Sequence, residues 1–156
     1  MPTPHLSRIR IACFAFAALL AVASLGAQDN PRFGKWKLKS DAPAPASNIM
    51  TYEAHGEGGM KITIEAVNAE GKKRKWGYVT FFDGKYRPVT GDSGTEESAV
   101  EVVDERTNKI YNRTGERVNT IINVLSEDGN TINNEYRNVN EDGTERVFHA
   151  VYERIQ

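Results

Sequence analysis

The chain has 156 residues, of which 20 are Lys or Arg and 21 are Asp or Glu, so its formal net charge at pH 7 is −1. This balance gives no reason to expect a nucleic-acid partner. The only cysteine, Cys13, excludes an intramolecular disulfide and a cluster of thiolate metal ligands.

Residues 1–27 are predicted to be a helical signal peptide for secretion. Arg8 and Arg10 precede an apolar run over residues 11–22, and small residues follow it, which is the layout of such a peptide. A membrane anchor is the alternative, but the apolar run is shorter than the ~20 residues that a spanning helix needs. We therefore expect a mature chain, residues 28–156, that is secreted or periplasmic and has no membrane span.

The first strand is predicted around residues 33–39. Lysines alternate there with Gly34, Trp36 and Leu38, so one face of the strand is charged and the other is mostly apolar. The next residues, 40–47, contain two prolines and predict an extended connector rather than a helix.

Further strands are predicted at short intervals along the rest of the chain. Residues 93–103 have one feature of a helix start, but the β-branched Val100, Val102 and Val103 favour a strand. The expected strands are Ile49 to His55, Met60 to Val67, Arg74 to Phe82, Lys85 to Val89, Ala99 to Asp104, Lys109 to Asn112, Arg117 to Ser126, Thr131 to Asn138 and Glu145 to Ile155.

Four similar turn sequences punctuate these strands and contain Gly71, Gly84, Gly129 and Gly143. Glycine reaches positive φ at no steric cost, so each sequence predicts a tight turn. Sequential hairpins make neighbours in sequence into neighbours in space, and closure removes the exposed edges of the sheet. We predict one all-β domain, a single antiparallel up-and-down β-barrel of about 8–10 strands. A two-sheet sandwich is the alternative.

The motif Gly34-x-Trp36-x-Leu38 near the start, and Val151-Tyr152-Glu153-Arg154 near the end, resemble the bacterial exported lipocalin-like proteins. These belong to the lipocalin and fatty-acid-binding-protein superfamily of up-and-down barrels. The resemblance implies that Trp36 closes one end of the barrel under Arg154, with Gly34 and Leu38 beside it, and that the interior binds a ligand.

Aromatic side chains are the candidate lining of that interior. Trp76, Tyr78 and Phe82 share one face of their strand, and Tyr52 lies on another. Tyr152 and Arg154 lie on one face of the last strand and are candidates for holding a ligand's polar end, as are Tyr111 and Arg113. A barrel filled by its own side chains is the alternative.

The leading functional hypothesis is an exported, non-enzymatic, monomeric barrel that binds a small hydrophobic or amphipathic ligand, without a cofactor or metal. The alternatives are a solid barrel that acts as an interaction or inhibitor module, and a haem-binding barrel with His149 as the iron ligand.

Asparagines recur between residues 119 and 140, and we expect them on an exposed face or in turns because Asn forms strands poorly.

Overall fold

The computed structural model of the protein describes residues 30–140 and 142–156 and folds them into a single antiparallel sheet. The expected signal peptide lies outside the described residues. Within them there is no helix that is both long and apolar enough to cross a membrane. The strands are β1 Gly34–Leu38, β2 Ser47–His55, β3 Gly59–Val67, β4 Lys73–Thr80, β5 Arg87–Pro88, β6 Thr90–Gly91, β7 Glu97–Val102, β8 Thr107–Thr114, β9 Arg117–Leu125, β10 Thr131–Val139 and β11 Glu145–Arg154.

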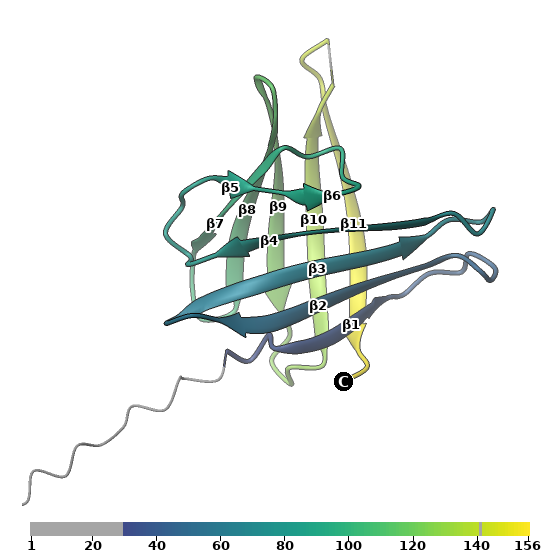
Figure 1. Ribbon diagram of the computed structural model, residues 1–156, viewed down its shortest axis with the longest axis horizontal. Coiled ribbons are helices and arrows are strands. Elements are labelled where there is room, and N and C mark those ends of the chain that lie inside the picture. Colours follow the sequence, from purple (N-terminus) through teal and green to yellow (C-terminus); the bar gives the residue numbers. More distant parts are fainter. Residues whose placement is uncertain (1–29, 141) are drawn as a thin grey trace, which may run out of the picture.

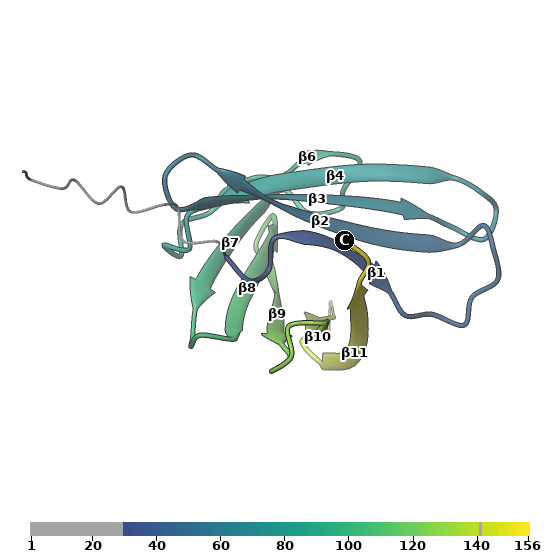
Figure 2. The ribbon, with the colours of Figure 1, turned by 90° about the horizontal axis from the view of Figure 1, so that it is seen from below.

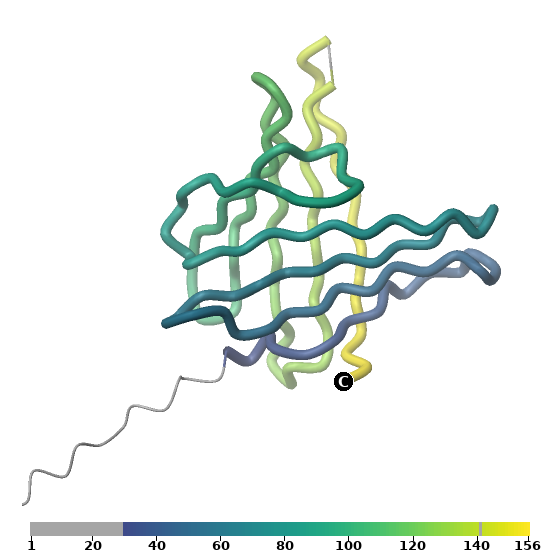
Figure 3. The backbone as a smooth tube through the Cα atoms, viewed as in Figure 1, coloured from purple at the N-terminus to yellow at the C-terminus, as the bar shows by residue number. Residues whose placement is uncertain are grey.

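The sheet curls into a nearly closed barrel (Figures 1 and 3). Its strand order is β5-β7-β8-β9-β10-β11-β1-β2-β3-β4-β6, so almost every strand pairs with its neighbour in sequence, and the last strand pairs with the first. The short strands β5 and β6 are successive parts of one extended segment, residues 87–91. One part pairs with β7 and the other with β4. The predicted all-β up-and-down barrel is confirmed.

The barrel is flattened, so that its two halves cross each other. In Figure 1, β1–β4 run across the direction of β8–β11, and Figure 2 shows β2–β4 on one side and β8–β11 on the other. Because side chains alternate between the two faces of a strand, every second residue from each half points toward the other half. Trp36, Ile132 and Val100 are among the largest side chains that are fully buried in this way.

Three of the four turn sequences make hairpins between adjacent strands. Gly71 donates its backbone N–H to the carbonyl of Asn68 at 3.0 Å, and the turns at Gly129 and Gly143 close with the same spacing. The fourth turn, at Gly84, lies instead in the connector that leaves β4 and leads to the 87–91 segment. Residues 97–102 form the strand that their β-branched composition predicts.

Candidate functional site

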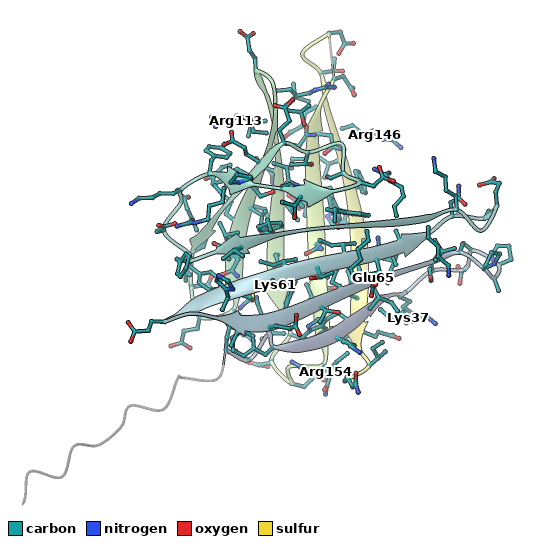
Figure 4. The ribbon with its side chains drawn as sticks, viewed as in Figure 1. Lys37, Lys61, Glu65, Arg113, Arg146 and Arg154 are labelled. Atoms are coloured by element: carbon teal, nitrogen blue, oxygen red, sulfur yellow. The ribbon has the colours of Figure 1, made fainter. Side chains whose placement is uncertain are left out.

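One end of the barrel is closed by Trp36 and Arg154. Trp36 is completely buried, and the guanidinium carbon of Arg154 lies 4.1 Å from the centre of its ring. Arg154 also donates hydrogen bonds to the carbonyls of Pro31 at 2.6 Å, Phe33 at 2.7 Å and Gly129 at 2.9 Å. Figure 4 places Arg154 at the end of the barrel where the chain terminates. Each of its three nitrogen atoms therefore donates a hydrogen bond within the protein.

Gly34 is required for this closed end. Its φ is +129°, a conformation that residues with a side chain rarely adopt, and a Cβ there would collide with the backbone carbonyl of Gln156. The C-terminal residue can therefore lie directly on β1, where Lys35 donates its N–H to the same carbonyl at 2.9 Å.

A buried arginine, Arg32, lies beneath the interior at this end. Only 3% of its surface is exposed. Its Nε donates to Oδ1 of Asn123 at 3.1 Å, and its Nη2 donates to the carbonyl of Arg106. The carbonyl of Arg32 in turn accepts a hydrogen bond from the indole of Trp36 at 2.9 Å. Arg32 could not be identified from the sequence, because its burial depends on contacts with residues far along the chain.

Beyond the closed end formed by Trp36 and Arg154, the interior of the barrel is hollow. A cavity of about 470 Å³ lies between its two halves, within the usual range of small-molecule sites. The barrel is thus not filled by its own side chains. Tyr52, Trp76, Tyr78 and Tyr152 line the cavity, as does Leu38, so the structure brings together four of the residues predicted as ligand contacts.

Two cross-strand rows form the wall on the β2–β4 side. Met50 pairs with Ile64, which pairs with Trp76, and Tyr52 pairs with Ile62, which pairs with Tyr78. Because these registers bring alternate residues of three strands onto the inner face, this wall is apolar and aromatic.

The inner face of the opposite half, which we call the polar wall, carries three asparagines, of which Asn134 lines the cavity. Asn108 and Asn134 both pair with Asn123, and each of these three asparagines is at most 4% exposed. The expectation that the asparagines lie outside is therefore wrong for Asn123 and Asn134. Period-two spacing from Leu125 and Ile132 places both on the inner face, and this was the sequence pattern that could have located them.

The next row along this wall carries larger side chains. Ile110 and Tyr136 both pair with Ile121, and Tyr136 also pairs with Phe148. The rings of Tyr136 and Phe148 are stacked, with centres 4.6 Å apart. All four of these residues line the cavity.

Two of the predicted ligand contacts lie elsewhere. Arg154 does not line the cavity, because its guanidinium is held over Trp36 at the closed end. Phe82 packs against the core but lines a second hollow, of about 500 Å³, together with Arg32 and Phe33. Its strand ends at Thr80, and a positive φ of 59° at Phe82 breaks the alternation that would have placed it with Tyr78.

Arg74 and Gly94 are exposed residues of the cavity lining, and we call the part of the cavity near Arg74 and residues 93–95 the mouth. The side chain of Arg74 is 45% exposed and forms an ion pair with Asp92, with Nε and Oδ2 3.3 Å apart.

Asn48 also lines the cavity, and its Oδ1 is buried without a hydrogen-bond partner among the described residues. Such an orphan acceptor is a natural contact for a ligand.

Three phenols of the cavity, those of Tyr52, Tyr78 and Tyr152, remain neutral at physiological pH. Burial raises the pKa of Tyr52 and of Tyr78. Burial also raises the pKa of Tyr152, and the nearby phenols of Tyr136 and Tyr52 add to the effect. Each of these three phenols therefore keeps its proton and remains a hydrogen-bond donor.

The other candidates from the sequence point away from the cavity. The side chain of His149 is 70% exposed and lies 3.3 Å from Glu135, which does not fit the alternative in which it binds iron inside the barrel. Tyr111 donates to Glu101 at 3.0 Å, and Arg113 forms an ion pair with Glu97. These are cross-strand pairs on the outer surface. No cluster of three or more His, Cys, Asp or Glu side chains suited to a metal occurs in residues 30–140 and 142–156.

Comparison with known proteins supports the fold. The barrel is similar to a Schistosoma mansoni fatty acid binding protein in complex with arachidonic acid, with a TM-score of 0.57 and 16% identity over 84% of this chain and 100% of that one. It is also similar to the fluorescent protein UnaG, with a TM-score of 0.53 and 12% identity over 78% of this chain and 96% of that one. The likeness is one of fold. No protein-family model and no curated protein matches the sequence.

Proposed function

We propose that the protein is a non-enzymatic carrier that binds one small hydrophobic or amphipathic molecule inside its barrel. The observation that carries this proposal is the cavity of about 470 Å³ between an aromatic wall and a partly polar wall. Such a lining, largely apolar with a few placed polar groups, is characteristic of ligand sites. The likeness in fold to a protein that holds arachidonic acid supports it.

We further propose that the carrier is monomeric and works after export, in the periplasm or outside the cell. The support for export is the apolar run over residues 11–22, preceded by Arg8 and Arg10. The mass of the intact protein isolated from the cell envelope tests both statements, as described below.

The binding proposal is tested with a neutral fluorescent probe, N-phenyl-1-naphthylamine. We expect saturable binding at one site per chain. Ala150 lines the cavity, so Ala150→Trp should fill it and abolish the fluorescence increase, while the milder Ala150→Leu should weaken binding.

The matched control is Val147→Trp on the same strand. Val147 is 46% exposed and points away from the interior, so this variant should bind the probe like the wild type. Far-UV circular dichroism checks that each variant is folded. The proposal fails if the wild type shows no saturable binding, or if folded Ala150→Trp and Val147→Trp behave alike.

A further inference from the structure

The polar wall contains a chain of hydrogen bonds that runs from the buried arginine to the cavity. Nε of Arg32 contacts Asn123 at 3.1 Å, the amide of Asn123 contacts that of Asn134 at 2.8 Å, and the amide of Asn134 contacts the hydroxyl of Tyr136 at 3.1 Å. We call these four residues the relay. Arg32, at its start, does not line the cavity, whereas Asn134 and Tyr136 do.

The arginine fixes the direction of every bond in the relay. A guanidinium can only donate, so the atom of Asn123 that faces Arg32 must be the oxygen Oδ1. The Asn123 nitrogen then donates to Oδ1 of Asn134, and the Asn134 nitrogen donates to the hydroxyl of Tyr136. The orientation of an amide is ordinarily ambiguous, but here the guanidinium at one end determines both amides.

This direction leaves the hydrogen of the Tyr136 hydroxyl unused by the relay. The hydroxyl oxygen accepts from Asn134, so its hydrogen is oriented away from that amide. The Tyr152 phenol also lines the cavity and is hydrogen-bonded with that of Tyr136. The hydroxyl of Tyr52, on the opposite wall, is directed at the sulfur of Met50 at 3.6 Å. The Tyr136 hydroxyl is therefore the donor that this wall offers to whatever lies in the cavity.

The lining of the cavity is poorly suited to bind a negatively charged ligand. Among the described residues that line it, Arg74 alone is charged, and it lies at the mouth. Its guanidinium is already engaged by the carboxylate of Asp92 and donates to the backbone carbonyl of the same residue at 3.0 Å. A carboxylate drawn into the interior would lose its hydration without meeting a cation.

We propose that the cavity selects neutral ligands that carry a hydrogen-bond acceptor, such as a ketone or ester carbonyl, and that the hydroxyl of Tyr136 donates to that acceptor. Arg32 acts as a positioning residue through Asn123 and Asn134. This inference rests on the proposed carrier function and specifies the class of molecule that is carried.

The test compares three ligands with chains of twelve carbons: 2-dodecanone, laurate and dodecane. Each competes with N-phenyl-1-naphthylamine at neutral pH, where laurate is ionised. We expect the ketone to bind most tightly, and laurate to bind at least about tenfold more weakly, because it must shed its hydration in a site without a free cation.

One substitution removes the proposed hydrogen bond. Tyr136→Phe keeps the ring that stacks on Phe148, removes the hydroxyl and leaves the amide of Asn134 without its acceptor in the relay. It should weaken the ketone about fivefold to tenfold, the effect of one ordinary hydrogen bond, and leave dodecane unchanged. The matched control is Tyr111→Phe, which removes a phenol from the outer surface and should alter neither ligand.

The outcomes separate this inference from the proposed function. If none of the three ligands and no probe binds, the carrier function itself fails. If laurate binds as tightly as the ketone, or if Tyr136→Phe weakens the ketone and dodecane equally, the carrier function stands and the selection of neutral acceptors is overturned.

Discussion

At the scale of single residues, the lining of the barrel includes residue types that are uncommon on the inner face of a strand. Asparagine is usually excluded from the inside of a strand, yet Asn123 and Asn134 are buried because Arg32 and Tyr136 satisfy their amides. Local sequence could not reveal this compensation, since Arg32 is 91 residues from Asn123. It did predict Tyr52, Trp76, Tyr78 and Tyr152, because period two alone places them on the inner face.

A substitution at Arg154 separates its structural role from ligand binding. Lysine retains the charge but not the planar set of donors, so Arg154→Lys should lose hydrogen bonds to three backbone carbonyls. We expect the free energy of unfolding to fall by about 1–2 kcal/mol, with the affinity for N-phenyl-1-naphthylamine unchanged. Urea unfolding and a probe titration measure the two quantities.

Arg146 provides the control for that experiment, because it is an exposed residue on the same strand. Arg146→Lys should leave both stability and affinity as they are. A loss of probe affinity in Arg154→Lys, at unaltered stability, would instead assign Arg154 to the ligand site.

At the scale of elements, turn residues and alternation predicted the order of the strands and their antiparallel pairing. The segment after β4 was the exception. It was predicted as one strand over residues 85–89, but it forms two short pairings, β5 with β7 and β6 with β4. A sequence pattern indicates that a segment is extended, but not which of two neighbours each of its residues will pair with.

The entry to this segment is held by an ion pair whose strength depends on pH. Arg87 donates two hydrogen bonds to the carboxylate of Asp83, at 2.7 and 2.9 Å, and these bonds lower the pKa of Asp83. Because the folded-state pKa lies below the unfolded value of about 3.9, the stabilisation is complete above that value and is lost as the pH falls further.

We therefore expect Asp83→Asn to flatten the acid limb of the stability profile. The urea midpoint of the wild type should decrease more steeply below about pH 4 than that of the variant. Asp41→Asn, a change in the exposed connector between β1 and β2, controls for the loss of one surface charge. Parallel acid limbs for the wild type and Asp83→Asn would show that the ion pair adds nothing to folding.

At the scale of the whole molecule, the barrel could be predicted but its hollowness could not. Closure follows from the number of strands and their sequential turns. Whether space remains inside depends on the sum of many side-chain volumes against the width of the barrel, and neither quantity can be read from a local pattern. The cavity can be recognised only in the folded structure, where the inward-facing side chains of the two halves lie opposite each other.

Native mass spectrometry of the protein isolated from its own cell envelope tests the molecule as a unit. We expect the mass of one chain that begins at Gln28, together with a bound small molecule that is released on denaturation. Accurate mass and fragmentation of the organic extract then establish whether this molecule is neutral and carries a carbonyl. A chain that keeps its first 27 residues would contradict export by a cleaved leader, and a dimer mass would contradict the monomer.

The segment over residues 87–91 closes the barrel with the shortest pairings in the sheet. It pairs with each neighbour over only two residues, whereas β2 and β3 pair over nine. A short ladder of paired residues separates at a lower free energy than a long one. We therefore expect the pairings of residues 87–91 to separate first around a ligand larger than the cavity, while the longer ladders stay intact.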